Sequence, residues 1–296
     1  MKKILATLLT MGLVVGMTAC GSKGNDATTA DSTEAVAEAS TEAVEETAEE
    51  ATEEASEEVA EEATEETTEE TTEETAEATG DVMTHEEYVA ADLDSPVTVE
   101  TYVQAKQGWW ENEGVGNATF YTQAEDGAYF LYNMPCSEED YEKLEVGTKI
   151  KVSGFKSEWS GEVEIVDATF EIEDGNYVAE PLDATSLLTD EALIDHQNEF
   201  ASFKGMTVEP STDADGNEVA FLYNWDGSGS QGDDLYFNVS VDGNTYTFTV
   251  ESYLCGKDTD VYKAVEALNV GDVVDMEGFL YWYEKVNPHI TSVTVQ

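Results

Sequence analysis

Apolar and polar residues alternate along most of the chain after residue 96, which is typical of strands that bury one face. In the first half of this region the alternation predicts five strands, whereas SEEDYEKL at residues 137–144 has helical spacing. Ser137 is a typical N-cap, acidic residues follow where the helix dipole favours negative charge, and Gly147 comes after the last turn. The five strands are predicted at residues 97–105, 117–124, 128–134, 148–155 and 162–172.

The second half of the region repeats the first. LEVGTKIKVSGF at residues 144–155 returns as LNVGDVVDMEGF at residues 268–279, and both copies begin where a helical segment ends. In the second half that helix is predicted from Thr259 to Leu268. Three strands, one helix and two strands in each half indicate an internal duplication. The strands of the second half are predicted at residues 202–209, 234–241, 244–251, 273–283 and 289–295.

This order of elements resembles the OB-fold, a five-stranded Greek-key barrel. The resemblance implies a mainly β protein with two tandem five-stranded OB-like barrels, each with one helix between strands 3 and 4. A pair of open β-sandwich modules is the alternative. In an OB-like barrel the repeated sequence lies where the helix runs into strand 4, so a leucine is expected to close the barrel end and two glycines to allow the turn and the bend. These residues are Leu144, Gly147 and Gly154 in the first copy, and Leu268, Gly271 and Gly278 in the second.

The N-terminus has the features of an export signal. Two lysines precede an apolar run from Ile4 to Val15 that is too short to span a bilayer as a mature helix. The following MTAC resembles the lipobox of bacterial lipoproteins, although Met17 stands where leucine is usual. The resemblance implies a signal peptide over residues 1–19 and a Cys20 that carries acyl chains such as palmitate; an ordinary secretory signal is the alternative. We therefore expect a lipid-anchored protein of the cell membrane that faces the extracellular side.

The composition changes abruptly between Cys20 and residue 79, where threonine, alanine and glutamate dominate. Pairs of glutamates recur every four residues from position 45 to position 73. Glutamates at this spacing repel one another in a helix, and the segment has no aromatic residue to bury. We expect a disordered acidic tether over residues 20–79, with a solvated single helix as the alternative.

The remaining chain is expected to form an OB-like module over residues 80–181, a short helical or irregular connector over residues 182–200 and a second module over residues 201–296. Thr189 or Asp190 is the predicted cap within the connector. Of the 66 acidic residues in the protein, 22 lie in the tether, which leaves 44 in the modules against nine lysines. The chain has no arginine. A polyanion is held by cations that displace its counterions, so nucleic acid is expected to be an unlikely partner.

No arrangement of residues in the sequence predicts catalysis. His85, His196 and His289 lie far apart, without metal-ligand spacing, and are interpreted as solvent-exposed or connector residues. DADGNE at residues 213–218 resembles part of a calcium loop, but Glu218 stands where the sharp-turn glycine should follow, so a hairpin turn is favoured. We therefore expect no catalytic residues, no cofactor and no metal.

Two cysteines occupy comparable places in the two halves. Cys136 and Cys255 each follow the third strand and precede the helix. An exported protein can pair its cysteines, but equivalent positions in tandem barrels need not face each other. Free, buried thiols are favoured.

Tryptophans gather at strand ends and in loops. They fall between strands 1 and 2 and between strands 4 and 5, the loops that flank the ligand face of an OB-fold. Ring faces there can stack on sugars or bases, or they can pack the barrel ends. The topology places Trp109 or Trp110 on the same side of the barrel as Trp159. The candidate ligand-binding residues are Trp109, Trp110, Trp159, Trp225, Tyr281 and Trp282.

These features predict a lipid-anchored, extracytoplasmic ligand-binding or adaptor protein without catalytic activity, whose partner is a cell-wall or host glycan or protein. MTACGSK, the acidic tether and the paired LxVGxxxxxxGF sequences make the chain resemble uncharacterised tandem-module lipoproteins of Gram-positive anaerobes. No activity comes with that resemblance. A passive envelope spacer is the alternative, and an oligonucleotide-binding OB protein is a third, less favoured hypothesis.

Overall fold

The computed structural model describes residues 80–296, which belong to one compact unit. The predicted signal peptide, Cys20 and the acidic tether lie outside the described residues. Within residues 80–296, no helix has the length and apolar character needed to cross a bilayer.

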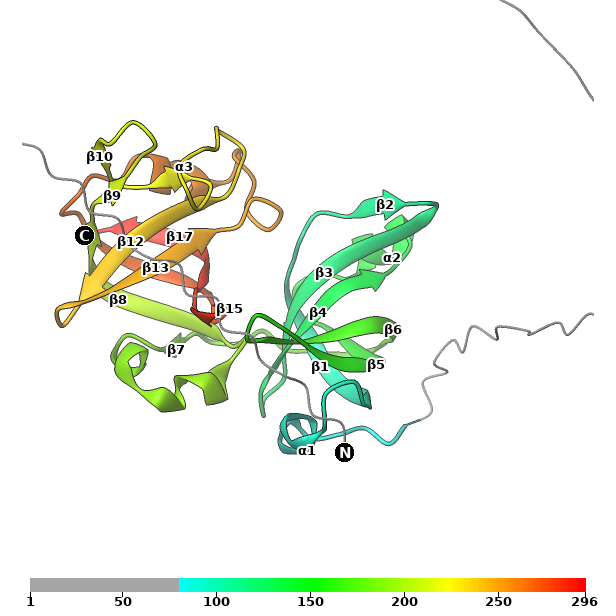
Figure 1. Cartoon of the computed structure of the whole chain (residues 1–296). Helices are drawn as coiled ribbons and strands as arrows, with labels where there is room; N and C mark the ends of the chain where they lie inside the picture. The colour runs from blue at the N-terminus through cyan, green and yellow to red at the C-terminus, as the bar shows by residue number, and fades with distance from the viewer. Residues whose placement is uncertain (1–79) are drawn as a thin grey trace, which may run out of the picture. The chain divides into compact units, whose positions relative to one another are not determined.

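Five strands of the first half close into a barrel, here called the first barrel (Figure 1). Its first strand pairs antiparallel with the second and the fourth, and its third strand pairs parallel with the fifth. The helix α2 (Glu138–Lys143) lies between the third and fourth strands and is capped by Ser137, as predicted. The barrel strands are β1 (Pro96–Lys106), β3 (Val115–Gln123), β4 (Ala128–Pro135), β5 (Thr148–Trp159) and β6 (Glu162–Asn176).

The second barrel repeats this pairing. Its first strand pairs antiparallel with the second and the fourth, and its third strand pairs parallel with the fifth. The helix α3 (Asp260–Glu266) again precedes the fourth strand and is capped by Thr259. The barrel strands are β8 (Phe200–Glu209), β12 (Leu235–Val241), β13 (Asn244–Val250), β14 (Val273–Phe279) and β17 (His289–Val295).

This pairing is the OB arrangement, and the predicted fold class is confirmed. The alternative of two open sandwiches is wrong, because the first strand of each half has a partner on both sides and closes the sheet. Shorter elements lie outside the barrel walls. They are α1 (His85–Ala90), β2 (Trp110–Asn112), β9 (Ser211–Thr212), β10 (Glu218–Val219), β11 (Leu222–Tyr223), β15 (Trp282–Tyr283) and β16 (Lys285–Val286).

The repeated sequence occupies equivalent places in the two barrels. Leu144 and Leu268 are buried, one in each barrel core, as expected of residues that close a barrel end. The turn glycines that follow, Gly147 and Gly271, have φ of 91° and 92°. Residues with a Cβ rarely adopt this left-handed conformation, so the turn requires glycine at both positions.

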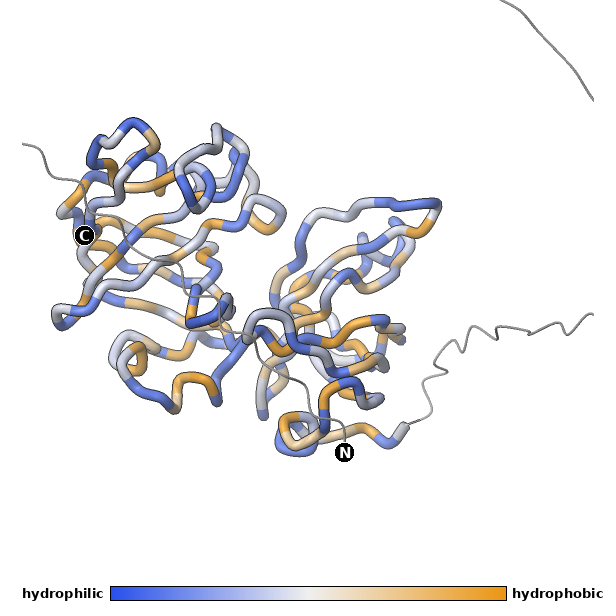
Figure 2. Tube along the Cα trace, viewed as in Figure 1, coloured by the Kyte–Doolittle hydropathy of each residue, from blue (hydrophilic) through white to orange (hydrophobic). Residues whose placement is uncertain are grey.

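Hydrophobic side chains fill the inside of each barrel, and hydrophobic and hydrophilic positions alternate along the strands (Figure 2). A third cluster joins the barrels to each other. Its buried members are Tyr121 and Phe130 of the first barrel and Phe279 of the second. The rings of Tyr121 and Phe279 are stacked, with centroids 4.5 Å apart. The barrels therefore share an apolar contact, built from the outward faces of strands.

The predicted connector contains β7 (Leu182–Asp183) and two 3₁₀ helices, η1 (Ser186–Thr189) and η2 (Glu191–His196). Asp190, one of the two predicted caps, accepts a hydrogen bond from the Ala192 N–H. The segment thus follows the helical or irregular structure expected of it, apart from the short strand β7, which pairs parallel with β8.

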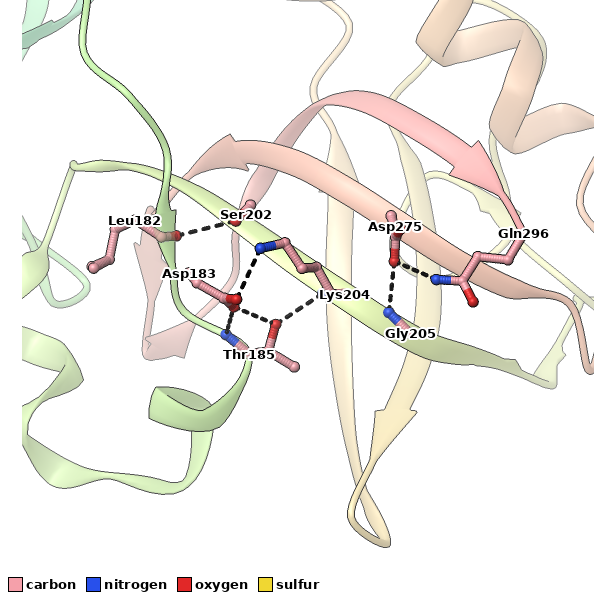
Figure 3. A network of polar contacts seen from close by, with 8 residues as sticks. All are labelled: Leu182, Asp183, Thr185, Ser202, Lys204, Gly205, Asp275 and Gln296. Atoms are coloured by element: carbon pink, nitrogen blue, oxygen red, sulfur yellow. Dashed lines mark hydrogen bonds and ion pairs between the residues drawn. The ribbon is translucent and has the colours of Figure 1, made fainter.

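A polar network fixes the start of this segment to the second barrel (Figure 3). Lys204 Nζ lies 2.9 Å from Asp183 Oδ2, and the Lys204 N–H donates to Thr185 Oγ1 at 2.8 Å. On the next strand, Asp275 accepts a hydrogen bond from the Gly205 N–H at 2.7 Å. Side chains on β7, β8 and β14 therefore bond to neighbouring backbone at the surface of the barrel.

Candidate functional site

The loop between β5 and β6 contacts β15 and β16 of the second barrel. The Glu284 N–H donates to the Ser160 carbonyl at 2.6 Å. The rings of Trp159 and Tyr283 lie 5.3 Å apart and are inclined by 46°. These are the two loops between strands 4 and 5 that were predicted to carry ligand-binding aromatic residues. Because they meet, the aromatic loops of both barrels contribute to one surface.

An open cleft of about 1630 Å³ lies along this junction. Aromatic rings from both barrels form much of its wall, with amide, hydroxyl and carboxyl groups between them. Among the described residues that line it, Lys285 is the one cationic side chain. The aromatic lining residues are Trp110, Phe130, Tyr132, Trp159, Trp225, Tyr236, Tyr253, Tyr281 and Tyr283.

The structure brings four of the six candidate residues together in this cleft. Trp110, Trp159 and Trp225 are exposed by 43%, 54% and 72%, and Tyr281 lies deeper, stacked 4.1 Å from the ring of His289. Large exposed rings gathered in one place are typical of a binding surface.

The other two candidates, Trp109 and Trp282, are packing residues. Trp109 packs against the first core and donates from Nε1 to the Cys136 carbonyl at 3.0 Å. Trp282 is buried in the second core. Each is the direct neighbour of a cleft residue, and successive side chains of extended backbone point to opposite sides. One member of each adjacent aromatic pair therefore faces the ligand cleft and the other packs inside.

Sequence reasoning missed several rings of the cleft, because it looked for aromatic residues in loops. Phe130 and Tyr132 lie within β4, on either side of the core residue Leu131. Tyr236 occupies an outward position in β12, the second strand of the second barrel, beside the core residue Phe237. The signal that could have found them is an aromatic residue at a position that the alternation predicts to face solvent.

Three carboxyl groups are buried at or beside the cleft, without a salt bridge to any described residue. Glu251 accepts hydrogen bonds from the Tyr253 and Leu254 N–H groups and from Gln107 Nε2. Burial nevertheless raises its pKa to about 7. Burial raises the pKa of Glu164, which lines the cleft on β6, to about 7 as well.

Glu162 is the most buried of the three and joins the two barrels. Its Oε2 accepts from the Trp282 N–H at 2.8 Å, across the junction. Its Oε1 has no partner among the described residues, and neither does Oδ1 of its neighbour Asn198. Burial raises the pKa of Glu162 to about 8. This carboxyl group is therefore largely protonated at neutral pH.

The sequence-based interpretation of His289 as a solvent or connector residue is wrong. Its side chain lies at the base of the cleft, where Nδ1 is 2.6 Å from the Tyr121 hydroxyl. Burial lowers the pKa of His289 to about 3 and raises the pKa of Tyr121, so the imidazole is neutral and the phenol keeps its proton. His289 therefore contributes a neutral imidazole that is hydrogen-bonded to Tyr121, rather than a charge.

Two further sequence features have a structural role. The DADGNE segment forms the turn between β9 and β10, where Asp213 Oδ1 accepts from the Asp215 and Asn217 N–H groups. Cys136 and Cys255 are buried free thiols, whose pKa values burial raises to about 11. Within residues 80–296, no group of three His, Cys, Asp or Glu side chains is placed to hold a metal ion.

No protein-family model matches the chain, and no curated protein matches it. Solved structures are similar in fold. The HINa domain of Ifi202, in complex with 20-bp double-stranded DNA, is 12% identical with a TM-score of 0.31, and the match covers 69% of this chain and 96% of that one. A murine DNA-binding protein bound with double-stranded DNA is 11% identical with a TM-score of 0.33, over 68% of this chain and 98% of that one. A replication protein A heterotrimer bound to single-stranded DNA is 14% identical with a TM-score of 0.28, over 66% and 50%.

These comparisons correct one expectation. Acidic composition was taken to make nucleic acid an unlikely partner, but three of the solved structures similar in fold are of proteins bound to double-stranded or single-stranded DNA. The expectation is corrected accordingly: composition alone does not make nucleic acid an unlikely partner. At 11% to 14% identity the similarity concerns the fold alone.

Proposed function

We propose that this protein is a non-enzymatic binding protein whose cleft holds a ligand of successive flat or cyclic units by stacking them on aromatic rings. The observation that carries the proposal is the convergence of Trp110, Trp159, Trp225 and Tyr281 on one cleft, from loops far apart in the sequence. Three of these rings are substantially exposed although apolar, a cost that ligand contact removes.

The first candidate ligand is a single-stranded oligonucleotide. OB barrels commonly bind oligonucleotides or oligosaccharides on their strand face and flanking loops. Stacking of a base on an aromatic side chain contributes about 1 to 3 kcal/mol and tolerates any sequence. With one lysine among the described lining residues, few counterions are released, so affinity should depend weakly on salt.

The second candidate is an oligosaccharide, which the polar part of the lining favours. Asn133, Asn238 and Asn287 present amides in the cleft, with Asp234 and Glu284 among the carboxylates. Amides both donate and accept, and carboxylates accept, so together they match the hydroxyl groups of a sugar. The same aromatic rings would stack on the apolar face of a sugar ring.

The test is a fluorescence titration of the purified full-length protein with a ten-residue oligothymidine and, separately, with soluble cell-wall and host oligosaccharides. One of the two series should saturate. Trp159→Ala and Trp225→Ala should each weaken that binding by roughly fivefold to a hundredfold. Trp109→Phe, which changes a ring outside the cleft, is the matched control and should bind normally. A protein that binds neither series would favour the passive spacer, and a ligand chemically altered after incubation would contradict the non-enzymatic role.

We propose in addition that Cys20 anchors the protein outside the cytoplasm through lipid, on the strength of the MTAC sequence and the preceding apolar run. Two acyl chains hold a protein on a membrane where one does not. Cys20→Ser should move the protein from the membrane fraction to the soluble fraction. A variant that stays membrane-bound would contradict the lipid anchor.

A further inference from the structure

Glu164 differs from the other buried carboxyl groups at the junction in having no partner among the described residues. Its side chain is 7% exposed and lines the cleft, yet no described residue donates a hydrogen bond to it or forms an ion pair with it. Glu251, by comparison, accepts three hydrogen bonds, and Asp234 accepts from the Ser252 N–H and hydroxyl. A buried carboxylate without donors is costly, and that cost falls when a cation comes within reach.

Glu164 shares the cleft wall with the aromatic residues Phe130 and Tyr281. Glu164 is the register partner of Phe130 on β4, and the ring of Phe130 contacts the ring of Tyr281 edge-on at 5.5 Å. Tyr281 and Glu164 line the same cleft, and burial, together with the charges of Glu162 and Glu164, raises the pKa of Tyr281. A carboxylate beside ring faces is the combination that binds organic ammonium groups, because both attract the positive charge.

We propose that Glu164, together with the rings of Phe130 and Tyr281, forms a subsite for a protonated amine carried by the ligand. This inference rests on the proposed stacking function and adds a charge requirement to it. Ca²⁺ takes six to eight oxygen ligands and Mg²⁺ an octahedral set, whereas an ammonium group is held by one carboxylate and neighbouring aromatic rings.

Amine binding at this subsite is linked to pH. The ammonium group favours the ionised carboxylate, whereas in the free protein the pKa of Glu164 is about 7. Binding therefore releases a proton below pH 7, and affinity rises as the pH increases from 6 to 8. The titratable groups that interact with Glu164 are Tyr88 and Tyr281, whose raised pKa values keep them protonated in this range, and the more buried Glu162. The charge of Glu251 also raises the pKa of Tyr281, and the pKa of Glu251 is itself about 7. Substitution of Glu164 is therefore needed to assign the pH dependence of binding to Glu164.

The test compares benzylamine with benzyl alcohol, which share one ring and nearly one shape but differ in charge. Both are titrated into the full-length protein, followed by tryptophan fluorescence and calorimetry. Benzylamine should bind roughly tenfold more tightly than the alcohol at pH 8. Glu164→Gln should remove this difference and flatten the pH dependence of benzylamine binding while leaving the alcohol unaffected. Glu158→Gln removes the same charge from an exposed position beside Trp159 but outside the cleft lining, and should change the ratio less than about twofold.

The outcomes separate this inference from the function on which it rests. Equal affinities for the two probes, or a ratio that survives Glu164→Gln, would overturn the amine subsite while stacking stands. Failure of both probes and of the oligomeric ligands would overturn both proposals. Because a buried, unpartnered carboxyl gains from replacement by an amide, Glu164→Gln is expected to fold normally, and its binding of the alcohol checks this directly.

Discussion

In both barrels, the turn that precedes the first strand is held by an equivalent backbone hydrogen bond. The side chain of the residue whose carbonyl accepts this bond differs between the barrels. In the first barrel, Asp94 has φ of 61°, and its N–H donates to the Lys156 carbonyl at 2.8 Å. In the second, Asn198 has φ of 70°, and its N–H donates to the Leu280 carbonyl at 2.8 Å. Lys156 and Leu280 each follow the last residue of the repeated sequence. The duplication thus extends to the turn that leads into strand 1.

The side chains at this shared position make different kinds of contact. Lys156 Nζ donates to the carbonyls of Tyr88, Val89 and Ala91, at 3.1, 2.8 and 2.9 Å. It therefore supplies donors to carbonyls at the end of α1, where the short helix makes few bonds of its own; of the three, the Tyr88 carbonyl also accepts from the Ala91 N–H. Leu280 has no exposed surface and packs in the apolar second core. Backbone geometry has been kept between the copies, whereas the chemistry of the buried side chain has changed from polar to apolar.

The largest expected effect comes from placing the charge of the first barrel in the second. Leu280→Lys buries an ammonium group in a core that contains no carbonyl cluster to receive it, so we expect a loss of about 3 to 5 kcal/mol in the free energy of unfolding. Urea denaturation measures this loss, and Leu280→Met, which keeps the volume without the charge, should cost less than about 1.5 kcal/mol. A Leu280→Lys variant as stable as the wild type would show that the second barrel accommodates a lysine here as the first does, and would contradict the proposed difference between the two positions.

The second prediction concerns the bend that both barrels make in strand 4. Gly154 and Gly278 lie at irregularities of strand register. A Cβ on Gly278 would lie 2.2 Å from the His289 carbonyl oxygen, and one on Gly154 would lie 2.7 Å from that of Val166. We expect Gly278→Ala to cost about 3 kcal/mol or more, and Gly154→Ala somewhat less. Gly108→Ala, where a Cβ meets nothing within 4 Å, is the control in the same denaturation series.

The strands and helices of both barrels could be predicted from the sequence because local signals specify them. Alternation marked the strands, and Ser137 and Thr259 marked the helix starts. The helix α1 was missed because it has only six residues and depends on a distant lysine to satisfy its carbonyls. A contact of this kind between residues far apart in sequence leaves no periodic pattern.

The contact between the barrels, and with it the cleft, was harder to predict. Tyr121 and Phe279 stack across the junction, although each belongs to a different barrel. An outward-facing aromatic residue gives the same alternation pattern in the sequence whether it contacts solvent, a ligand or another barrel. For the same reason, the sequence could propose Trp109 and Trp110 together but could not tell which of the two packs inside.

The third prediction returns to the polar side of the comparison. Lys156→Met removes three hydrogen bonds from the end of α1 but keeps the apolar length of the side chain. We expect a loss of about 2 kcal/mol and faster hydrogen exchange at the Tyr88 N–H, which bonds to the Thr84 carbonyl inside the helix. Unchanged exchange at Tyr88 would show that α1 is held by its packing alone.

The fourth prediction tests whether the proton on Glu162 supports the junction of the barrels. Because the pKa of Glu162 is raised to about 8, the folded state holds this proton more tightly than the unfolded state, and its contribution to stability is lost as the pH rises from about 4.5 to 8. The slope attributable to this residue is at most about 1.4 kcal/mol per pH unit. Glu162→Gln mimics the protonated form, so it should match the wild type at pH 5 and exceed it in stability at pH 9. Parallel stability curves for the two proteins between pH 5 and pH 9 would contradict a buried proton at this site.

The smallest effect is expected from Lys204, which shows what a lysine contributes when it stays in solvent. Its ammonium group lies 2.9 Å from the Asp183 carboxylate, a distance similar to the 3.1 and 2.9 Å at which Lys156 donates to Tyr88 and Ala91. The Lys204 and Asp183 side chains, however, are 60% and 53% exposed. Solvent screens such a pair, and ordering two long side chains costs entropy, so Lys204→Ala should lower the free energy of unfolding by less than about 1 kcal/mol. The N–H of Lys204 keeps its bond to Thr185 in the variant, since that bond uses the backbone. Urea denaturation at low and high salt distinguishes the cases: the effect of Lys204→Ala should fade with added salt, whereas the effect of Lys156→Met should persist. A salt-independent loss at Lys204 comparable to that at Lys156 would mean that burial is not what separates the two lysines.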